Sequence, residues 1–191
     1  MVRVRDPIQM VDRQCGECTL CCRLVPVQEL DKAANQQCRY RQFRKGCRIY
    51  ATRPHSCRTW TCRWLTDPDT LMLWRPDQAH YVIDGAPDFV EIQETPESPR
   101  RRIPVIQIWV DPKLPNSHRD YKLRRYLEKQ WLEHEYLGLI RFDADKALLL
   151  IPPAATSDKQ WRAFQGVSTG HENSPEEIIK TCGSAFLESV S

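Results

Sequence analysis

The chain has 191 residues, of which 41% are hydrophobic and 28% are charged, and its formal net charge is +3. This length fits one domain, or one domain with a small additional lobe, and so small a net charge does not point to a partner. The longest apolar run (147–155) is too short to cross a bilayer, and the basic N-terminus lacks the apolar segment of a secretory signal. We therefore expect a cytoplasmic protein without a membrane partner.

Eight of the nine cysteines lie between residues 15 and 62. In a reducing cytosol, clustered thiols are typical of zinc or iron–sulfur sites, and disulfides are rare. The stretch begins with two overlapping Cys-x-x-Cys steps, from Cys15 to Cys18 and from Cys18 to Cys21, each of which brings two sulfur atoms to one side of a turn. Cys22 follows directly, and adjacent cysteines rarely bind the same ion. Eight thiols can form two four-cysteine sites, or one four-cysteine cluster and a second, partly filled site.

Positive charge coincides with the cysteines. Residues 1–65 contain 13 Lys and Arg against 5 Asp and Glu, a net +8, whereas residues 66–191 carry a net −5. Basic side chains near thiols lower the thiol pKa and so favour the metal-binding thiolate, whose charge they also offset. The sequence therefore favours this local compensation over nucleic-acid binding as the reason for the excess. We expect Arg53 to hydrogen-bond the thiolates and to anchor the metal-binding loop.

Within the cysteine-rich stretch the sequence predicts little regular structure beyond a short helical turn at 28–34. Metal coordination takes the place of a hydrophobic core in such a segment. Six large side chains are expected to pack around the site and to exclude water from it. They are Tyr40, Phe43, Ile49, Tyr50, Trp60 and Trp64.

The rest of the chain combines strand and helix patterns. Apolar runs, the third of them rich in β-branched residues, predict strands at 80–84, 89–93, 103–110, 139–142 and 147–151, and 143–146 is a good hairpin connection between the last two. Capping patterns predict helices that start at Ser117, Ser157 and Ser174, the first of them ending near Gly138. On the last of these helices Cys182 falls on the apolar stripe, which indicates a core residue and not a ligand.

The predicted fold class is α+β. A metal-held, cysteine-rich N-terminal lobe (residues 1–65) is expected to pack on a small, mostly antiparallel sheet with two or three helices (residues 66–191). Two domains of unequal size are therefore predicted, and the metal site lies in the smaller one.

The spacing Cys-x-x-Cys-x-x-Cys-Cys at residues 15–22 resembles the YkgJ-like cysteine-cluster family, whose domains are described as chelating zinc or iron. Later residues agree with that family, namely the run Gly-Cys-Arg-Ile-Tyr at 46–50, the Arg-Pro step at 53–54 and the Cys-Arg step at 57–58. The resemblance covers residues 15–65. It implies a metal site formed by Cys15, Cys18, Cys21, Cys22, Cys38, Cys47, Cys57 and Cys62.

Neither the resemblance nor the cysteine spacing decides between zinc and iron. The leading interpretation is a cytoplasmic protein that chelates zinc or iron, with an iron–sulfur cluster as one form of the centre. Family members related to flagellin lysine methylation imply an alternative, an iron–sulfur enzyme in redox or methyl-transfer chemistry. A third interpretation is a zinc-stapled adaptor for nucleic acid or protein. No catalytic residue is assigned, because the chain has no Ser/His/Asp order, glycine-rich phosphate loop or paired-carboxylate motif.

Overall fold

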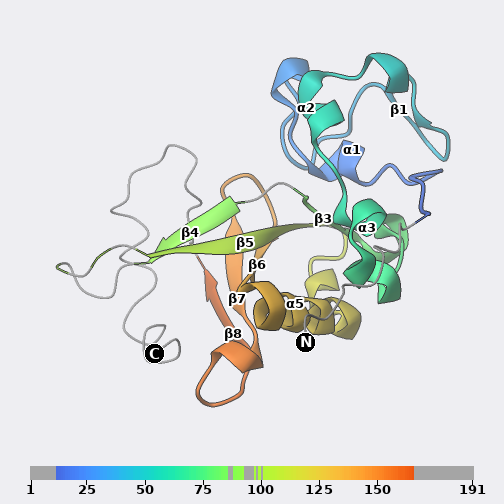
Figure 1. Cartoon of the computed structure of the whole chain (residues 1–191). Helices are drawn as coiled ribbons and strands as arrows, with labels where there is room; N and C mark the ends of the chain where they lie inside the picture. The colour runs from blue at the N-terminus through green and yellow to red at the C-terminus, as the bar shows by residue number, and fades with distance from the viewer. Residues whose placement is uncertain (1–11, 86–87, 93–96, 98, 100, 166–191) are drawn as a thin grey trace, which may run out of the picture.

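The computed structural model describes residues 12–85, 88–92, 97, 99 and 101–165 (Figure 1). Its α-helices are α1 (Cys21–Leu24), α2 (His55–Thr59), α3 (Arg63–Thr66), α4 (Pro76–Ala79) and α5 (Tyr121–His134). Its strands are β1 (Arg41–Gln42), β2 (Gly46–Cys47), β3 (Tyr81–Ile83), β4 (Asp88–Ile92), β5 (Arg101–Val110), β6 (Leu137–Arg141), β7 (Ala147–Ile151) and β8 (Arg162–Gln165). Short 3₁₀ turns lie at Gln28–Leu30, Tyr50–Thr52, Pro68–Met72, Ser117–Arg119 and Pro153–Ala155. Across the part of the chain described, no helix combines the length and the apolar character needed to span a membrane.

A six-stranded sheet in the order β3-β5-β6-β7-β8 forms the larger part of the fold, with β4 beside β5. The long strand β5 pairs antiparallel with β4 through its first half and with β3 through its last residues. On its other side β5 runs parallel to β6, and α5 makes the connection between these two strands. The pairs β6–β7 and β7–β8 are again antiparallel. The predictions of an α+β fold and of a mostly antiparallel sheet are confirmed, as are the five predicted strands.

The two faces of the sheet pack against different partners because successive side chains of a strand point to opposite sides. Ile106 and Ile108 of β5 form a buried cluster with Leu123 of α5. Trp109 faces the other way and packs with Leu20 of the N-terminal segment. We call residues 12–62 the cysteine lobe. In Figure 1 this lobe lies beside one end of the sheet, near β3 and α3, and α5 lies on the other side.

Besides the packing of Trp109 on Leu20, polar and backbone contacts join the cysteine lobe to the sheet. Arg23, at the end of α1, forms an ion pair with Asp111, which follows β5 and is 3% exposed at its side chain. Cys62 makes an antiparallel β-bridge with Asp84, directly after β3. The last cysteine of the motif is therefore attached to the sheet through its backbone.

The helix predictions were partly wrong. Residues 157–161 form a turn followed by β8, and not a helix, because Asp158 accepts a bond from Gln160 N–H at 3.2 Å and Lys159 has a left-handed φ of +56°. The helix expected at Ser117 begins at Tyr121 with Asp120 as its N-cap, and it ends at His134, before the predicted position. The turn predicted at 28–34 is shortened to three residues. The predicted helix at Ser174, with Cys182, lies outside the described residues.

Candidate metal centre

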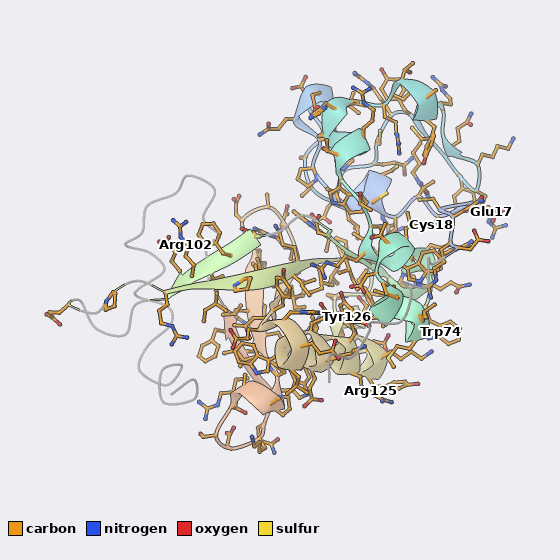
Figure 2. The ribbon with its side chains drawn as sticks, viewed as in Figure 1. Glu17, Cys18, Trp74, Arg102, Arg125 and Tyr126 are labelled. Carbon is orange, nitrogen blue, oxygen red and sulfur yellow. The ribbon has the colours of Figure 1, made fainter. Side chains whose placement is uncertain are left out.

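Four of the eight cysteines line one cavity at the junction of the cysteine lobe and the sheet. The rest of its wall is aromatic and aliphatic, so the thiols lie in surroundings of low polarity. The lining residues are Cys15, Cys18, Cys21, Trp60, Cys62, Trp64, Leu65, Pro76 and Val82. Figure 2 shows Cys18 on the side of the lobe that faces α3. We call Cys15, Cys18, Cys21 and Cys62 the cavity set.

Local backbone structure places these thiols. Cys15 and Cys18 are joined by a tight turn, in which Cys18 N–H donates to the Cys15 carbonyl at 2.8 Å and Gly16 takes a left-handed φ of +51°. Cys21 is the first residue of α1, so the chain enters a helix three residues after Cys18. Cys62 comes from the distant segment that is bridged to the sheet.

Burial makes three of the four cavity thiols weak acids. It raises the pKa of Cys15 and Cys18, and it raises the pKa of Cys62 to about 12. Desolvation penalises an isolated thiolate, so these groups stay protonated at neutral pH unless a cation binds them. A bound metal ion reverses this preference because it deprotonates the thiols that coordinate it.

A second group of thiols influences the charge of a buried lysine. Lys32 Nζ donates to the backbone carbonyls of residues 23, 25 and 33, and burial lowers its pKa. The thiols of Cys38, Cys22 and Cys57 raise the pKa of Lys32 and so oppose the effect of burial, and the neighbouring Cys21 acts in the same way. All four thiols are therefore within electrostatic reach of the ammonium group. Cys38 N–H also donates to the Cys22 carbonyl at 2.9 Å. We call Cys22, Cys38 and Cys57 the lysine set.

The Cys22 thiol ionises more easily than an ordinary cysteine. A hydrogen bond with the Cys21 thiol lowers the pKa of Cys22 to about 7, and Lys32, Arg41 and Arg53 act in the same direction. The Arg53 charge also lowers the pKa of Cys15, against the larger effect of burial. The Arg53 charge therefore influences both sets, but its buried Nε has no hydrogen-bond partner, so the expected bond to a thiolate stays a prediction.

The structure brings seven of the predicted ligands into these two sets and leaves Cys47 outside them. Cys47 lies in β2, opposite Arg41, and belongs to neither set. All eight cysteines between residues 15 and 62 are free thiols in the structure. No three of their sulfur atoms, within the described residues, lie within 4.8 Å of one another. Four thiolates on one tetrahedral zinc ion would stand about 3.8 Å apart, because a zinc–sulfur bond is about 2.3 Å long.

Buried hydrogen-bond donors without a partner are concentrated in the cysteine lobe and against it. Among the described residues, four buried side-chain nitrogens have no hydrogen-bond partner, namely those of Arg23 (Nε), Arg53 (Nε), Trp60 (Nε1) and Trp109 (Nε1). Three of these residues belong to the cysteine lobe, and Trp109 packs against it. A buried polar group without a partner is uncommon and calls for an explanation, such as a bound ion or water. Sulfur atoms of a metal centre can accept such N–H groups.

The aromatic residues expected around the site divide into two groups. Trp60 and Trp64 line the cavity, as predicted. Phe43 and Tyr50 do not, since their side chains are 69% and 58% exposed. The prediction was wrong for these two because the β1–β2 hairpin and the turn after it carry them to the surface of the lobe.

Two further groups near the cavity set have no motif in the sequence. Arg13 donates to the Trp64 carbonyl at 2.8 Å, and the Cys62 thiol opposes the lowering of the Arg13 pKa by burial. Asp77, paired with Arg75 at 2.6 Å, has its pKa lowered by that pair and by a hydrogen bond from Cys18. Arg13 is far in sequence from Cys62, and Asp77 is far in sequence from Cys18. Residue spacing could therefore not have identified either of them.

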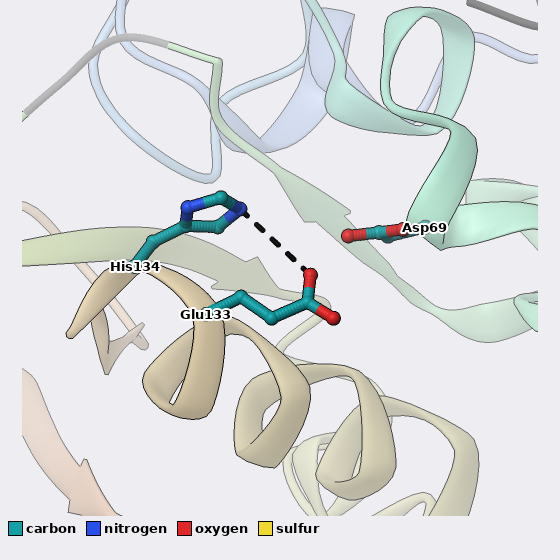
Figure 3. A group of neighbouring side chains, drawn as sticks. All are labelled: Asp69, Glu133 and His134. Carbon is teal, nitrogen blue, oxygen red and sulfur yellow. Dashed lines mark ion pairs between the residues drawn. The ribbon is translucent and has the colours of Figure 1, made fainter. Parts of the chain in front are cut away.

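A separate cluster of potential ligand atoms lies on the surface (Figure 3). Asp69, Glu133 and His134 form the group of three within 4.8 Å that the described residues contain. Asp69 already accepts bonds from Lys129 at 2.6 Å and from Gln130 at 2.9 Å, one at each carboxylate oxygen. Glu133 and His134 are exposed, and an ion pair of 4.0 Å joins them. We interpret this cluster as a surface ion-pair network.

Comparisons of the chain with models of known protein families, with curated proteins and with solved structures found no match. The functional proposals below are therefore argued from the residues of this chain and their arrangement.

Proposed function

We propose that this protein binds metal through its cysteine lobe, and that the cavity set is the principal site. The observation that carries the proposal is that Cys15, Cys18, Cys21 and Cys62 line one cavity although the last is remote from the others in sequence. The resemblance of residues 15–65 to the YkgJ-like family agrees with this proposal. So do the four unpaired N–H donors at the lobe.

We infer that iron, held as an iron–sulfur cluster, suits the cavity set better than a single zinc ion. A closed zinc site needs its sulfurs about 3.8 Å apart, and no three thiols come within 4.8 Å of one another in the described chain. In an iron–sulfur cluster the thiolates bind different iron atoms and therefore stand farther apart. Such a cluster supplies electron storage and transfer when bound.

The surrounding residues have separate roles in this proposal. Trp60 and Trp64 exclude water from the cavity, which strengthens every charge interaction inside it. The cations of Arg53 and Lys32 offset the charge of the thiolates in the two sets. The unpaired N–H groups of Arg53 and Trp60 are donors that can bond to sulfur.

Metal analysis of protein purified without oxygen tests the proposal. We expect a brown protein that contains iron and acid-labile sulfide in comparable amounts. Cys18→Ser and Cys62→Ser should each reduce the iron content several-fold, because each removes one of four ligands. Cys182→Ser is the matched control and should leave it unchanged, since Cys182 lies outside the cysteine-rich stretch.

A colourless protein with stoichiometric zinc would contradict the iron–sulfur assignment and favour the zinc-stapled adaptor. Protein without any bound metal under these conditions, or equal metal content in all three variants, would contradict the metal-binding proposal itself.

A further inference from the structure

Two groups of basic side chains in the cysteine lobe have different surroundings. Between Asp31 and Asp67 the chain carries nine Lys and Arg and no Asp or Glu. Lys32, Arg41 and Arg53 lower the pKa of Cys22, so they lie near the thiols and compensate for them. Local compensation therefore accounts for part of the excess charge.

The other group lies on the surface of the β1–β2 hairpin and beside it. Arg39, Arg44, Lys45 and Arg48 are exposed, and the turn from residue 42 to 45, closed by a bond of 3.1 Å, presents two of them at its tip. No carboxylate of the described residues forms an ion pair with any of the four. In Figure 1 this hairpin, labelled β1, lies on the part of the lobe that is remote from the sheet. These cations therefore face solvent and have no compensating partner within the described chain.

Exposed aromatic rings accompany these cations. Phe43, at the hairpin tip, is 69% exposed, with the guanidinium groups of Arg41 and Arg44 at 5.6 and 5.2 Å from its ring centre. Tyr50 is 58% exposed and has the Arg53 guanidinium 3.8 Å from its ring centre. The exposed Phe43 ring between two guanidinium groups offers a flat face beside positive charge, a combination that suits a partner with both flat rings and negative charge.

We propose that the hairpin surface formed by residues 39–50 binds single-stranded nucleic acid. Arg39, Arg44, Lys45 and Arg48 contact phosphates, and an unpaired base stacks on Phe43. Stacking on an aromatic ring is independent of sequence because every base has a flat face, and arginine beside the ring strengthens it. An acidic protein would use the cations but not the ring, and a membrane would need a larger apolar surface than one phenyl group offers. No residue of this surface lines the cavity.

Binding of short single strands to the full-length protein tests the proposal. Fluorescence anisotropy with labelled oligouridylate and oligothymidylate of about twelve nucleotides should show binding that weakens steeply between about 50 and 200 mM salt. Arg44→Ala/Lys45→Ala should weaken binding at least about tenfold and reduce the slope of log K against log salt by about 1.4, since each phosphate contact to a single strand contributes about 0.7. Phe43→Leu should weaken binding about 5- to 100-fold, whereas Phe43→Trp should retain it.

Arg119→Ala/Arg125→Ala is the matched control. It removes the same charge from two exposed arginines next to and on α5, where Figure 2 shows Arg125, and it should bind like the wild type. The metal content of each variant should equal that of the wild type, which separates loss of this surface from loss of the metal centre. Three results would overturn the proposal: no binding at low salt, an equal loss in the hairpin and control variants, or polyglutamate and anionic vesicles that bind as tightly as the oligonucleotides.

Discussion

His118 is a buried histidine that the fold holds in its neutral form. Its side chain lies between the sheet and the segment before α5, where Nδ1 is 2.8 Å from the Pro115 carbonyl and the ring meets Phe142 edge-on at 5.5 Å. Burial lowers the pKa of His118 below its usual value, and the nearby charges of Arg124 and Arg119 lower it further.

This shift makes stability depend on pH in a defined direction. Above the unfolded-state pKa of about 6.5 the histidine is neutral in both states, and its contribution to stability is complete. Below that pH the unfolded chain binds a proton that the folded chain does not, so the free energy of unfolding falls by up to about 1.4 kcal/mol per pH unit until the folded-state pKa is passed. Urea unfolding at pH 7.5 and 5.5 should show a smaller loss for His118→Gln than for the wild type. An identical pH dependence of the two proteins would contradict this account.

At the residue level, the sequence indicated which local thiols lie together but not all of the charged groups near them, and metal binding by these thiols stays a prediction. Cysteine spacing identified Cys15, Cys18 and Cys21, because these are local in the chain and now line one cavity. Lys32 and Arg13 could not be found in this way. Their proximity to the thiols arises from tertiary packing, and a single lysine or arginine has no distinguishing pattern.

Helix α5 and the sheet approach each other closely at Gly138 of β6. A Cβ atom at Gly138 would lie 2.9 Å from Leu127 Cδ1 and 3.3 Å from Cδ2. Leu127 is fully buried in the cluster that joins α5 to the sheet, so its side chain has little room to move. Gly138 is therefore required for the close approach of the two elements.

Gly138→Ala should reduce the free energy of unfolding by about 1–3 kcal/mol, the usual cost of overpacking a core. The double variant Gly138→Ala/Leu127→Ala should cost less than the sum of the two single variants, because the second change removes the atoms that clash. Urea unfolding of the four proteins measures this coupling. Strictly additive effects would show that the clash is relieved in another way.

At the scale of elements, strands with strong β-branched runs were predicted well and weak or locally ambiguous segments were not. The strand β5 was recognised from its Ile and Val residues, whereas β8 was missed because Arg162–Gln165 contains one large apolar side chain and alternates between half-buried and exposed positions. Ser117 failed as an N-cap because its hydroxyl donates to the His80 carbonyl at 3.1 Å, across the fold. Such a tertiary bond leaves no trace in the local sequence.

For the whole molecule, the proposal predicts that metal removal affects the two parts of the chain differently. The sheet and α5 have a hydrophobic core of their own, whereas the cysteine lobe has few buried apolar residues and short helices. Chelation should therefore abolish amide hydrogen-exchange protection in residues 12–62 and leave most of it in β5, β6 and β7. Restoring the metal should restore the protection. Unchanged exchange in the lobe after complete metal loss would mean that packing alone maintains it.

The attachment of Cys62 to the sheet has a mechanical consequence. Three cysteines of the cavity set lie in residues 15–21 at the start of the lobe, and the fourth, Cys62, is bridged to Asp84 beside β3. A metal centre that binds all four sulfurs must then fix the segment 15–21 relative to the sheet. A displacement of that segment from the sheet would separate the Cys62 sulfur from the other three. By mass action, tighter binding of the cation makes separation of this segment from the sheet rarer. Occupancy of the centre would therefore report directly on whether the segment is packed against the sheet.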